Sequence, residues 1–290
     1  MPAPAEHCHM IVPTSNSQAV AAELAAALGE PLAEVEYRRF PDGELMVKVP
    51  EPEGRAVVVG ATDTSEAHVQ LLQLQDAVRE AGATDVVTVI PYMGYARQDE
   101  AFEPGQPVSS RAMARAISTG TDRVLTVCPH EPAIAEFFTV PTEVLDASGR
   151  LAEPLPGDLT DPVFLAPDHG AIELAETVRD AYGRGETDAF EKHRDRETGA
   201  VSIEPATLDV ADRDLVVVDD IIATGGTMSA AIDALGTEPE RVFVATVHPL
   251  LVAGARAKLE NAGVEGIYGT DTIERAVTEV SVAPTIASNL

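Results

Sequence analysis

Positive charge is scarce in this chain of 290 residues: 20 lysines and arginines face 48 aspartates and glutamates, which gives a net charge of −28 at pH 7. Only three of the basic residues are lysines, Lys48, Lys192 and Lys258. A surface this negative repels nucleic acids and anionic membranes, which excludes a general binder of either. It also repels nucleotides and sugar phosphates, so a site for such ligands needs local arginines or a divalent metal.

Cysteine and long apolar stretches are also lacking. Two cysteines, Cys8 and Cys128, are too few for a disulfide framework. The first ten residues, MPAPAEHCHM, show neither the basic start nor the apolar core of a secretory signal. No run of about 18 apolar residues could cross a membrane. We therefore expect a cytoplasmic protein.

The excess of acidic residues favours a cytoplasm rich in salt. Acidic side chains hold water, and molar salt screens their mutual repulsion. A halophilic protein is therefore our expectation, although an acidic protein from an ordinary cytoplasm would share this composition.

Short β-branched runs alternate with longer segments rich in alanine and leucine. Runs that are almost continuously apolar are typical of parallel strands buried on both faces. The expected strands are Ala56–Gly60, Val86–Ile90, Val124–Val127, Val163–Ala166, Leu215–Val218 and Val242–Val247. The expected helices are Ser17–Leu28, Glu66–Ala81, Ser109–Thr119, Ala171–Tyr182, Met228–Leu235 and Val252–Ala262. This alternation predicts an α/β fold.

Two stretches of the chain repeat one pattern. Arg55–Pro91 and Arg213–Pro249 each begin with an arginine and a valine-rich strand. Each continues with a loop, a helix and a second strand that ends in Thr-Val-x-Pro, at the same spacing. Equal length and matched ends favour duplication of a domain over chance, although βαβ units are common.

The chain length also favours two domains, at about 150 residues per domain. The best boundary is the stretch rich in proline and glycine between Pro141 and Pro156. We therefore predict domains over residues 1–142 and 143–290. A second stretch, Gly183–Pro205, is charged and has no clear period, and irregular loops of this length are usually functional or disordered.

The strongest motif is VVVDDIIATGGTM, residues Val216–Met228. An apolar strand ends in two carboxylates, Asp219 and Asp220, and a small loop then opens a helix. Glycines let the backbone approach a ligand closely, and the N–H groups of the loop and helix start suit a phosphate. Thr224 and Thr227 add hydroxyl donors, while the carboxylates suit sugar hydroxyls or a metal. The motif therefore favours a sugar-phosphate site over a plain glycine turn.

Other motifs place polar side chains near the expected strands. FPDGE contains Asp42 and Glu44, which would share one face if the segment is extended, although Pro-Asp-Gly by itself is a turn signature. YMGYARQ follows the strand Val86–Ile90 and supplies Arg97, a cation for a nucleotide. His130 and Asp168 each follow a strand as candidate metal ligands.

These motifs together resemble one family. DDIIATGGT is similar to the phosphoribosyl-pyrophosphate motif shared by type I phosphoribosyltransferases and ribose-phosphate pyrophosphokinases. FPDGE and YARQD resemble the ATP-binding segments of the second group, and Lys192-x-Arg194 resembles its catalytic loop. The resemblance covers nearly the whole chain, in the family's order, and is closest to the compact archaeal kind. It implies two tandem, duplicated type I phosphoribosyltransferase-like domains with mainly parallel sheets.

The resemblance also implies a reaction, a cofactor and site residues. The family transfers the β,γ-diphosphoryl group of ATP to the C1 hydroxyl of ribose 5-phosphate, which gives phosphoribosyl pyrophosphate and AMP. The implied ATP-binding residues are Asp42, Gly43, Glu44, Arg97 and Gln98. The implied ribose-5-phosphate residues are Arg194, Asp219, Asp220, Ala223, Thr224, Gly225, Gly226 and Thr227. Lys192 and Arg194 would be catalytic, and His130 and Asp168 would hold Mg²⁺.

The sequence departs from the family pattern at two positions, and other functions stay open. Cys128 stands where the family usually has aspartate, and His169 where a small or acidic residue is common. The resemblance implies a homo-oligomer built from dimers, with neither nucleic acid nor membrane as a partner. The alternatives are a phosphoribosyltransferase that consumes phosphoribosyl pyrophosphate and a regulatory paralogue without catalysis.

Overall fold

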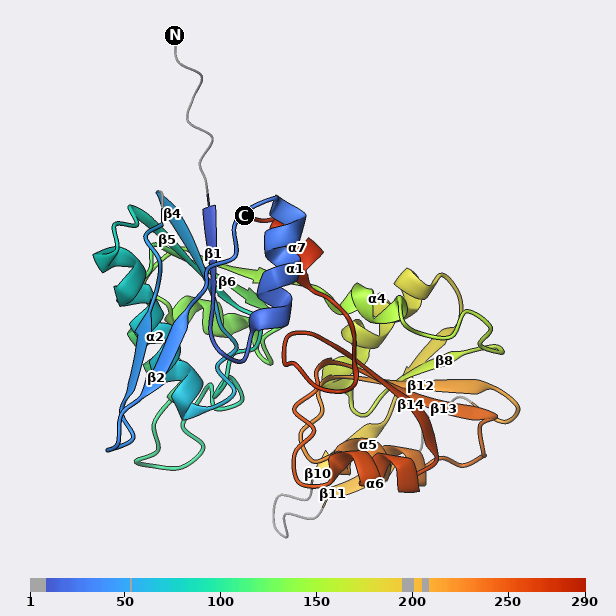
Figure 1. The fold of residues 1–290 in the computed structure, drawn as a ribbon. Coiled ribbons are helices and arrows are strands. Elements are labelled where there is room, and N and C mark those ends of the chain that lie inside the picture. The colour runs from blue at the N-terminus through green and yellow to red at the C-terminus, as the bar shows by residue number, and fades with distance from the viewer. Residues whose placement is uncertain (1–8, 53, 195–200, 205–208) are drawn as a thin grey trace. The chain divides into compact units, whose positions relative to one another are not determined.

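The computed structural model describes residues 9–52, 54–194, 201–204 and 209–290 (Figure 1). The chain divides into two compact units. Unit 1 contains the chain up to Asp146 together with Asp271–Glu274 and Ser281–Leu290, and unit 2 contains Ala147–Thr270 and Arg275–Val280.

Unit 1 is built on a parallel sheet with the strand order β1-β4-β5-β6-β7. These strands are β1 (His9–Pro13), β4 (Arg55–Val59), β5 (Asp85–Ile90), β6 (Arg123–Val127) and β7 (Thr142–Leu145). An antiparallel hairpin, β2 (Glu36–Arg39) and β3 (Leu45–Lys48), stands between β1 and β4 in the chain. The helices are α1 (Gln18–Leu28), α2 (Ser65–Glu80), α3 (Ser109–Ile117), the 3₁₀ helix η1 (Pro132–Phe137) and α7 (Ala283–Ala287). In Figure 1, α1 and α7 lie side by side, and α2 lies on the other side of the sheet.

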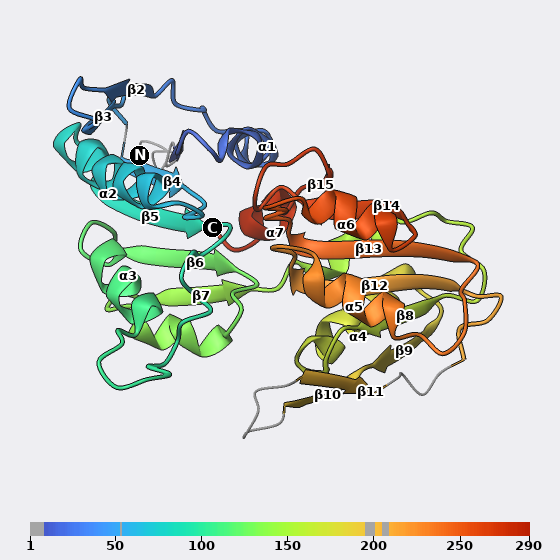
Figure 2. The ribbon, with the colours of Figure 1, turned by 90° about the horizontal axis from the view of Figure 1, so that it is seen from below.

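Unit 2 is built on a parallel sheet with the order β15-β14-β13-β12-β8-β9. Its strands are β8 (Val163–Ala166), β9 (Glu186–Ala189), β12 (Asp214–Ile221), β13 (Arg241–His248), β14 (Val264–Thr270) and β15 (Thr278–Val280). The antiparallel pair β10 (Glu191–Arg194) and β11 (Val201–Glu204) stands apart from this sheet. The helices are η2 (Ser148–Ala152), η3 (His169–Ala171), α4 (Ile172–Tyr182), α5 (Gly226–Asp233) and α6 (Ala255–Asn261). Figures 1 and 2 show α5 and α6 together, with α4 across the sheet from them in Figure 1.

The two sheets share one topology. The order β1-β4-β5-β6-β7 in unit 1 corresponds to β8-β12-β13-β14-β15 in unit 2. Each unit inserts an antiparallel pair before its second strand of this series, β2–β3 in one and β10–β11 in the other. β9, which pairs with β8 at the edge of the sheet in unit 2, also has a counterpart in unit 1. There, an isolated parallel bridge joins Ile11 of β1 to Leu32. The predicted duplicated α/β fold with parallel sheets is therefore confirmed.

The central strands are covered on both faces, as the continuous burial of β4 shows. Ala56, Val57, Val58 and Val59 of β4 are all fully buried. Ala56 and Val58 pack in one cluster with Leu71 of α2, while their neighbours point to the opposite face. Continuous apolar runs are what such doubly covered parallel strands require.

Local signals fix the ends of several helices. The side chain of Thr64 accepts a hydrogen bond from the N–H of Ala67 at 3.0 Å and so caps the start of α2. Glu66 in the first turn and Arg79 in the last turn of α2 complement the helix dipole. α1 ends at Gly29, which takes a left-handed conformation with φ of 68°.

The prediction of an irregular loop over Gly183–Pro205 is wrong, because this stretch contains β9, β10 and β11. The stretch Pro141–Pro156, expected as the domain boundary, contains the unpredicted strand β7. These strands are four residues long and each contains charged residues, so they lack the apolar run that marks a central strand. The division into domains at residue 142 stays a prediction; in the structure, β7 pairs with β6 of unit 1.

Within the residues that the structure describes, no helix is long and apolar enough to cross a membrane.

Candidate active site

The predicted sugar-phosphate residues gather at the carboxyl ends of neighbouring strands in unit 2. β12 lies between β8 and β13, and all three strands run parallel. Asp219 and Asp220 are near the end of β12, and Asp168 comes two residues after the end of β8. Because parallel strands end at one edge of a sheet, this edge is where α/β proteins bind ligands.

The loop Ala223–Thr227 leads from β12 into α5. Gly225 has φ of 71°, and a Cβ built on it would lie 3.2 Å from the carbonyl oxygen of Ala255. Glycine is therefore required here both by its backbone conformation and by the close approach of α6. The N–H of Val252 donates to the carbonyl of Ala223 at 2.9 Å and holds the start of the loop.

The loop delivers free N–H groups to an open surface. α5 begins at Gly226, and the first N–H groups of a helix have no partner within it. Thr224 and Thr227 are exposed, and a Cβ built on Gly226 would meet no atom closer than 3.6 Å. Backbone donors, hydroxyl groups and the positive end of a helix dipole together suit a phosphate group.

The carboxylates beside the loop concentrate negative charge. Burial raises the pKa of Asp219 well above its usual range, and the neighbouring Asp220 and Asp168 carboxylates add to this rise. The N–H of Asp220 donates to Oδ1 of Asp219 at 3.0 Å, and the hydroxyl of Thr246 donates to the carbonyl of Asp220 at 3.1 Å. This arrangement fixes both acids at a place where a cation or a set of sugar hydroxyls would relieve their repulsion.

The predicted Mg²⁺ ligands lie in different units. Asp168, whose Oδ1 accepts a hydrogen bond from the N–H of Gly170 at 3.0 Å, belongs to unit 2, and the exposed His130 follows β6 in unit 1. In the described part of the chain, no three histidine, cysteine or acidic side chains cluster to hold a metal. Mg²⁺ commonly needs only one or two protein carboxylates when phosphates and water complete its shell, and Asp168, Asp219 and Asp220 supply oxygen ligands of that kind.

Cys128, which departs from the family pattern, lies beside a carboxylate that the sequence analysis missed. Its Sγ is 3.7 Å from Oδ1 of Asp146 and 3.6 Å from the carbonyl oxygen of Leu145. Cys128 has φ of 38°, and its N–H donates to Leu145 at 2.9 Å. Asp146 directly follows the unpredicted strand β7. It therefore places a carboxylate beside Cys128, the position at which the family usually has an aspartate.

Arg97 and Gln98 lie beyond the end of β5, as predicted. Arg97 is exposed, and in the described residues it forms no ion pair within 4 Å. One end of the Gln98 side chain is already hydrogen-bonded, because its Oε1 accepts a hydrogen bond from the hydroxyl of Ser109 at the start of α3. Tyr95, between them and β5, takes a left-handed conformation with φ of 64° and contacts the ring of His68.

The predicted geometry of FPDGE is wrong. Asp42, Gly43 and Glu44 form part of the tight loop between β2 and β3, where the N–H of Phe40 donates to the carbonyl of Glu44 at 2.8 Å. Gly43 has φ of 94°, which turns the chain, and Oδ1 of Asp42 accepts from the N–H of Glu44 at 3.2 Å. Asp42 and Glu44 therefore do not share a face of an extended segment; both are exposed at the hairpin tip.

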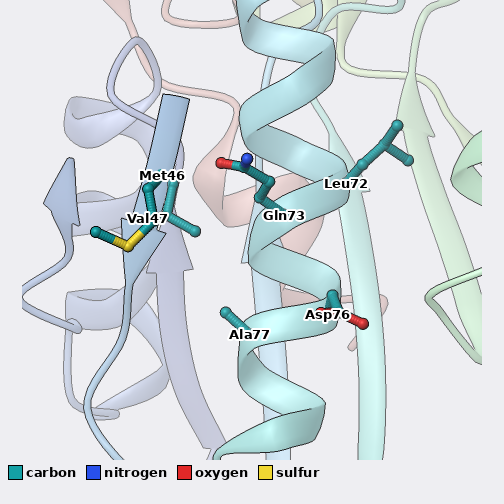
Figure 3. Close-up of a pocket in the computed structure, with 6 residues that line it drawn as sticks. All are labelled: Met46, Val47, Leu72, Gln73, Asp76 and Ala77. Atoms are coloured by element: carbon teal, nitrogen blue, oxygen red, sulfur yellow. The ribbon is translucent and has the colours of Figure 1, made fainter. Parts of the chain in front are cut away.

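The hairpin that carries this tip is fastened to α2. Nε2 of Gln73 donates to the carbonyl of Leu45 at 2.7 Å. A groove of about 360 Å³ lies between β3 and α2 (Figure 3). The groove is lined by Met46, Val47, Leu72, Gln73, Asp76 and Ala77. None of these residues belongs to the motifs described above.

Lys192 and Arg194 occupy alternate positions of β10, where they pair in register with Ile203 and Val201 of β11. Their side chains lie outside the described residues, so their catalytic role stays a prediction.

Comparisons with known proteins agree on the family. Residues 9–120 match the family model described as the N-terminal domain of ribose phosphate pyrophosphokinase, and residues 142–284 match the phosphoribosyl transferase domain. A ribose-phosphate pyrophosphokinase of Halobacterium salinarum is 62% identical over 283 residues, which cover 97% of this chain and 100% of the relative. One of Methanosarcina mazei is 43% identical over 94% of this chain and 92% of its own length.

A solved structure shares the fold. The phosphoribosylpyrophosphate synthetase of Mycobacterium smegmatis superposes with a TM-score of 0.82 at 24% identity, over 97% of each chain. The relatives and the two matched domains place the chain in the ribose-phosphate pyrophosphokinase family.

Proposed function

We propose that this chain catalyses the transfer of the β,γ-diphosphoryl group of ATP to ribose 5-phosphate with the residues described above. In this reaction the C1 hydroxyl oxygen forms a bond to the β-phosphorus, and the bond from that phosphorus to the α-phosphate oxygen breaks. AMP leaves, the hydroxyl proton is released, and phosphoribosyl pyrophosphate forms. The main support for this proposal is that the loop Ala223–Thr227, at the start of α5, lies beside the two carboxylates of β12.

Ribose 5-phosphate occupies the loop of unit 2 in this proposal. The N–H groups at the start of α5 and the hydroxyls of Thr224 and Thr227 bind the 5-phosphate. Asp219 and Asp220 accept hydrogen bonds from the ribose hydroxyls, directly or through a cation. These contacts fix the C1 hydroxyl for attack, and such positioning is a large part of catalysis in phosphoryl transfer.

ATP is held by residues of unit 1. Arg97 has no ion-pair partner among the described residues, so its guanidinium can bind the phosphates of the nucleotide. The side-chain amide nitrogen of Gln98 can donate a hydrogen bond to the nucleotide. The hairpin tip supplies Asp42, Gly43 and Glu44. Lys192 and Arg194 of β10 are proposed to stabilise the charge that develops on the transferring group.

Mg²⁺ is the proposed cofactor. Asp168 and His130 are its proposed protein ligands, and the carboxylates of β12 adjoin Asp168. An ion held by these residues would supply positive charge that offsets the negative charge met by the attacking oxygen. A divalent ion of this kind also offsets the repulsion of ATP by a chain with a net charge of −28.

We also propose a homo-oligomer built from dimers, acting in the cytoplasm of a halophile. Sedimentation of the purified protein tests the first point, since a monomer at all concentrations would contradict it. The salt dependence of folding and activity tests the halophilic character.

The deciding experiment measures AMP release from purified protein with ATP, Mg²⁺ and ribose 5-phosphate. It is run in about 0.1 M and in multimolar KCl, a range over which the Debye length falls from about 10 Å to below 3 Å. We expect AMP that requires ribose 5-phosphate, with a greater rate at high salt. Absence of AMP at both salt concentrations, from protein shown to be folded, would overturn the proposal.

Product analysis separates the alternatives. Consumption of phosphoribosyl pyrophosphate with a free base would indicate a phosphoribosyltransferase. Binding of ribose 5-phosphate without AMP formation would indicate a regulatory paralogue. The two relatives named above, both ribose-phosphate pyrophosphokinases that match more than 90% of this chain, favour neither.

A further inference from the structure

Lys258 lies beside the loop proposed to bind the 5-phosphate, although no sequence motif includes it. α6, which carries Lys258, packs on this loop through Ala255 and Leu259, both fully buried. A Cβ built on Gly225 would lie 3.2 Å from the carbonyl oxygen of Ala255 and 3.4 Å from Cγ of Leu259. The helix is therefore held tightly against the glycine pair of the loop.

The ammonium group of Lys258 reaches the second glycine of this pair. Its Nζ lies 3.8 Å from a Cβ built on Gly226, and Oγ1 of Thr224 lies 3.6 Å from the same point. A cation and a hydroxyl thus flank the first residue of α5, where the helix N–H groups are free. A phosphate group at this position would meet all three kinds of donor.

Lys258 carries a positive charge on the exposed side of α6. Among the described residues it forms no ion pair within 4 Å, and its side chain is exposed. Arg256 on the same helix differs, since its Nε lies 2.8 Å from Oε1 of Glu260, one turn away. A free ammonium is unusual in a chain with only three lysines and 48 acidic residues.

We infer that Lys258 binds the 5-phosphate of ribose 5-phosphate and so distinguishes the phosphorylated sugar from free ribose. This inference rests on the proposed function of the loop Ala223–Thr227. A phosphate monoester carries between one and two negative charges near pH 7, and lysine binds phosphate as a point charge. The helix N–H groups offer only partial charges, whereas the ammonium supplies a full positive charge at this end of the substrate.

The expected effect is on binding rather than on the chemical step. The 5-phosphate is remote from the C1 hydroxyl and keeps its charge throughout the reaction. A contact made equally in the ground state and the transition state changes KM and leaves kcat nearly unaltered.

The experiment compares Lys258→Met, Lys258→Arg and the control Arg256→Met. Binding of ribose 5-phosphate and of ribose is measured by calorimetry with Mg²⁺ present, and AMP release is measured in parallel. The KCl concentration is the lowest at which circular dichroism shows every variant folded, because salt screens the contact. We expect Lys258→Met to raise the Kd and KM for ribose 5-phosphate at least about tenfold, as for loss of a charged hydrogen bond. Lys258→Arg should recover most of the affinity.

The remaining outcomes separate this inference from the proposed function. Ribose binding, the KM for ATP and kcat should stay within about twofold of the wild type in Lys258→Met, and Arg256→Met should match the wild type throughout. An unchanged Kd in Lys258→Met, or an equal loss in Arg256→Met, would overturn the role of Lys258. Wild-type protein that binds ribose 5-phosphate through Lys258 but releases no AMP would overturn the proposed function and leave the inference standing.

Discussion

Asp214 and Arg241 stand directly opposite one another at the first positions of the parallel strands β12 and β13. The carboxylate of Asp214 is fully buried and accepts hydrogen bonds from Nε and Nη2 of Arg241 at 2.9 and 2.6 Å. It also accepts one from the N–H of Thr160 at 2.5 Å. In unit 1, Arg55 and Asp85 occupy the corresponding first positions of β4 and β5 with the charges exchanged, and there both side chains are about one-third exposed.

This difference in burial predicts a difference in stability. Asp214→Ala should lower the free energy of unfolding by about 2–3 kcal/mol, because it removes charged hydrogen bonds from a buried site and leaves an N–H unpaired. Asp85→Ala should cost less than about 1 kcal/mol, as is usual for exposed ion pairs. Denaturant unfolding of both variants at one salt concentration measures the two values. Equal losses would show that burial does not set the strength of these pairs.

The same pair predicts acid sensitivity. Burial acts to raise the pKa of Asp214, but hydrogen bonds from Arg241 and Thr160 and the charge of Arg241 outweigh it, so the pKa is lowered. The stability that Asp214 contributes is therefore present above the ordinary aspartate pKa of about 3.9 and is lost as the pH falls through the folded value. The difference in unfolding free energy between wild type and Asp214→Asn should be constant from about pH 7 to 5 and shrink below about pH 4. A difference that grows on acidification would contradict this assignment.

Asp219 should show the opposite dependence. Its pKa is raised by burial and by Asp220 and Asp168, so its favourable contribution is full below the ordinary aspartate pKa and is lost as the pH rises through the folded value. Asp219→Asn should therefore raise the Tm of the ligand-free protein, more at pH 8 than at pH 5, while AMP release falls by orders of magnitude. Thermal unfolding at both pH values without divalent ions measures the first effect. If the Tm of Asp219→Asn at pH 8 is equal to or below that of the wild type, ionisation of Asp219 does not destabilise the ligand-free protein.

The glycine pair of the phosphate loop allows a matched comparison. Gly225→Ala should destabilise the protein by about 2 kcal/mol, because alanine is strained at φ of 71° and its Cβ would press on the carbonyl of Ala255. Gly226→Ala should leave the Tm nearly unchanged, since a Cβ there has open space. Thermal unfolding tests both. Equal tolerance of the two alanines would mean that α6 does not pack on the loop as described.

Lys192→Ala should lower turnover by orders of magnitude with little change in the fold. The reason is that a cation facing the transferring group stabilises charge that develops only in the transition state. Steady-state kinetics and circular dichroism check the two parts, and His193→Ala serves as a control in the same strand. Near-normal turnover in Lys192→Ala would refute its catalytic role.

The sequence predicted the elements whose signal is local. The central strands are marked by unbroken apolar runs, and the phosphate loop by its glycines, acids and threonines. Short strands such as β7 and β9 mix charged with apolar residues, and their pairing depends on neighbours distant in the chain. Edge strands of this kind carry little signal of their own.

The parts of the site that were missed depend on tertiary structure. Asp146 meets Cys128 only because β7 pairs with β6, and Lys258 meets Gly226 only because α6 packs on the loop. The scarcity of lysine could have directed attention to Lys258 once a phosphate site was suspected. The extended geometry expected for Asp42 and Glu44 is wrong because the turn that Pro-Asp-Gly signals forms there, with Gly43 at φ of 94°.

The path of the last twenty residues sets an order for folding during synthesis. β15 belongs to unit 2, while the segments on either side of it, Asp271–Glu274 and Ser281–Leu290, belong to unit 1. Within unit 1, α7 packs on α1, and Oε1 of Glu274 accepts a hydrogen bond from the N–H of Ala19 at 2.6 Å (Figure 1). The ribosome therefore makes the first helix of the protein long before it makes the helix that covers it. Unit 1 is begun first but is completed only after unit 2, so one side of α1 stays uncovered until α7 has been made.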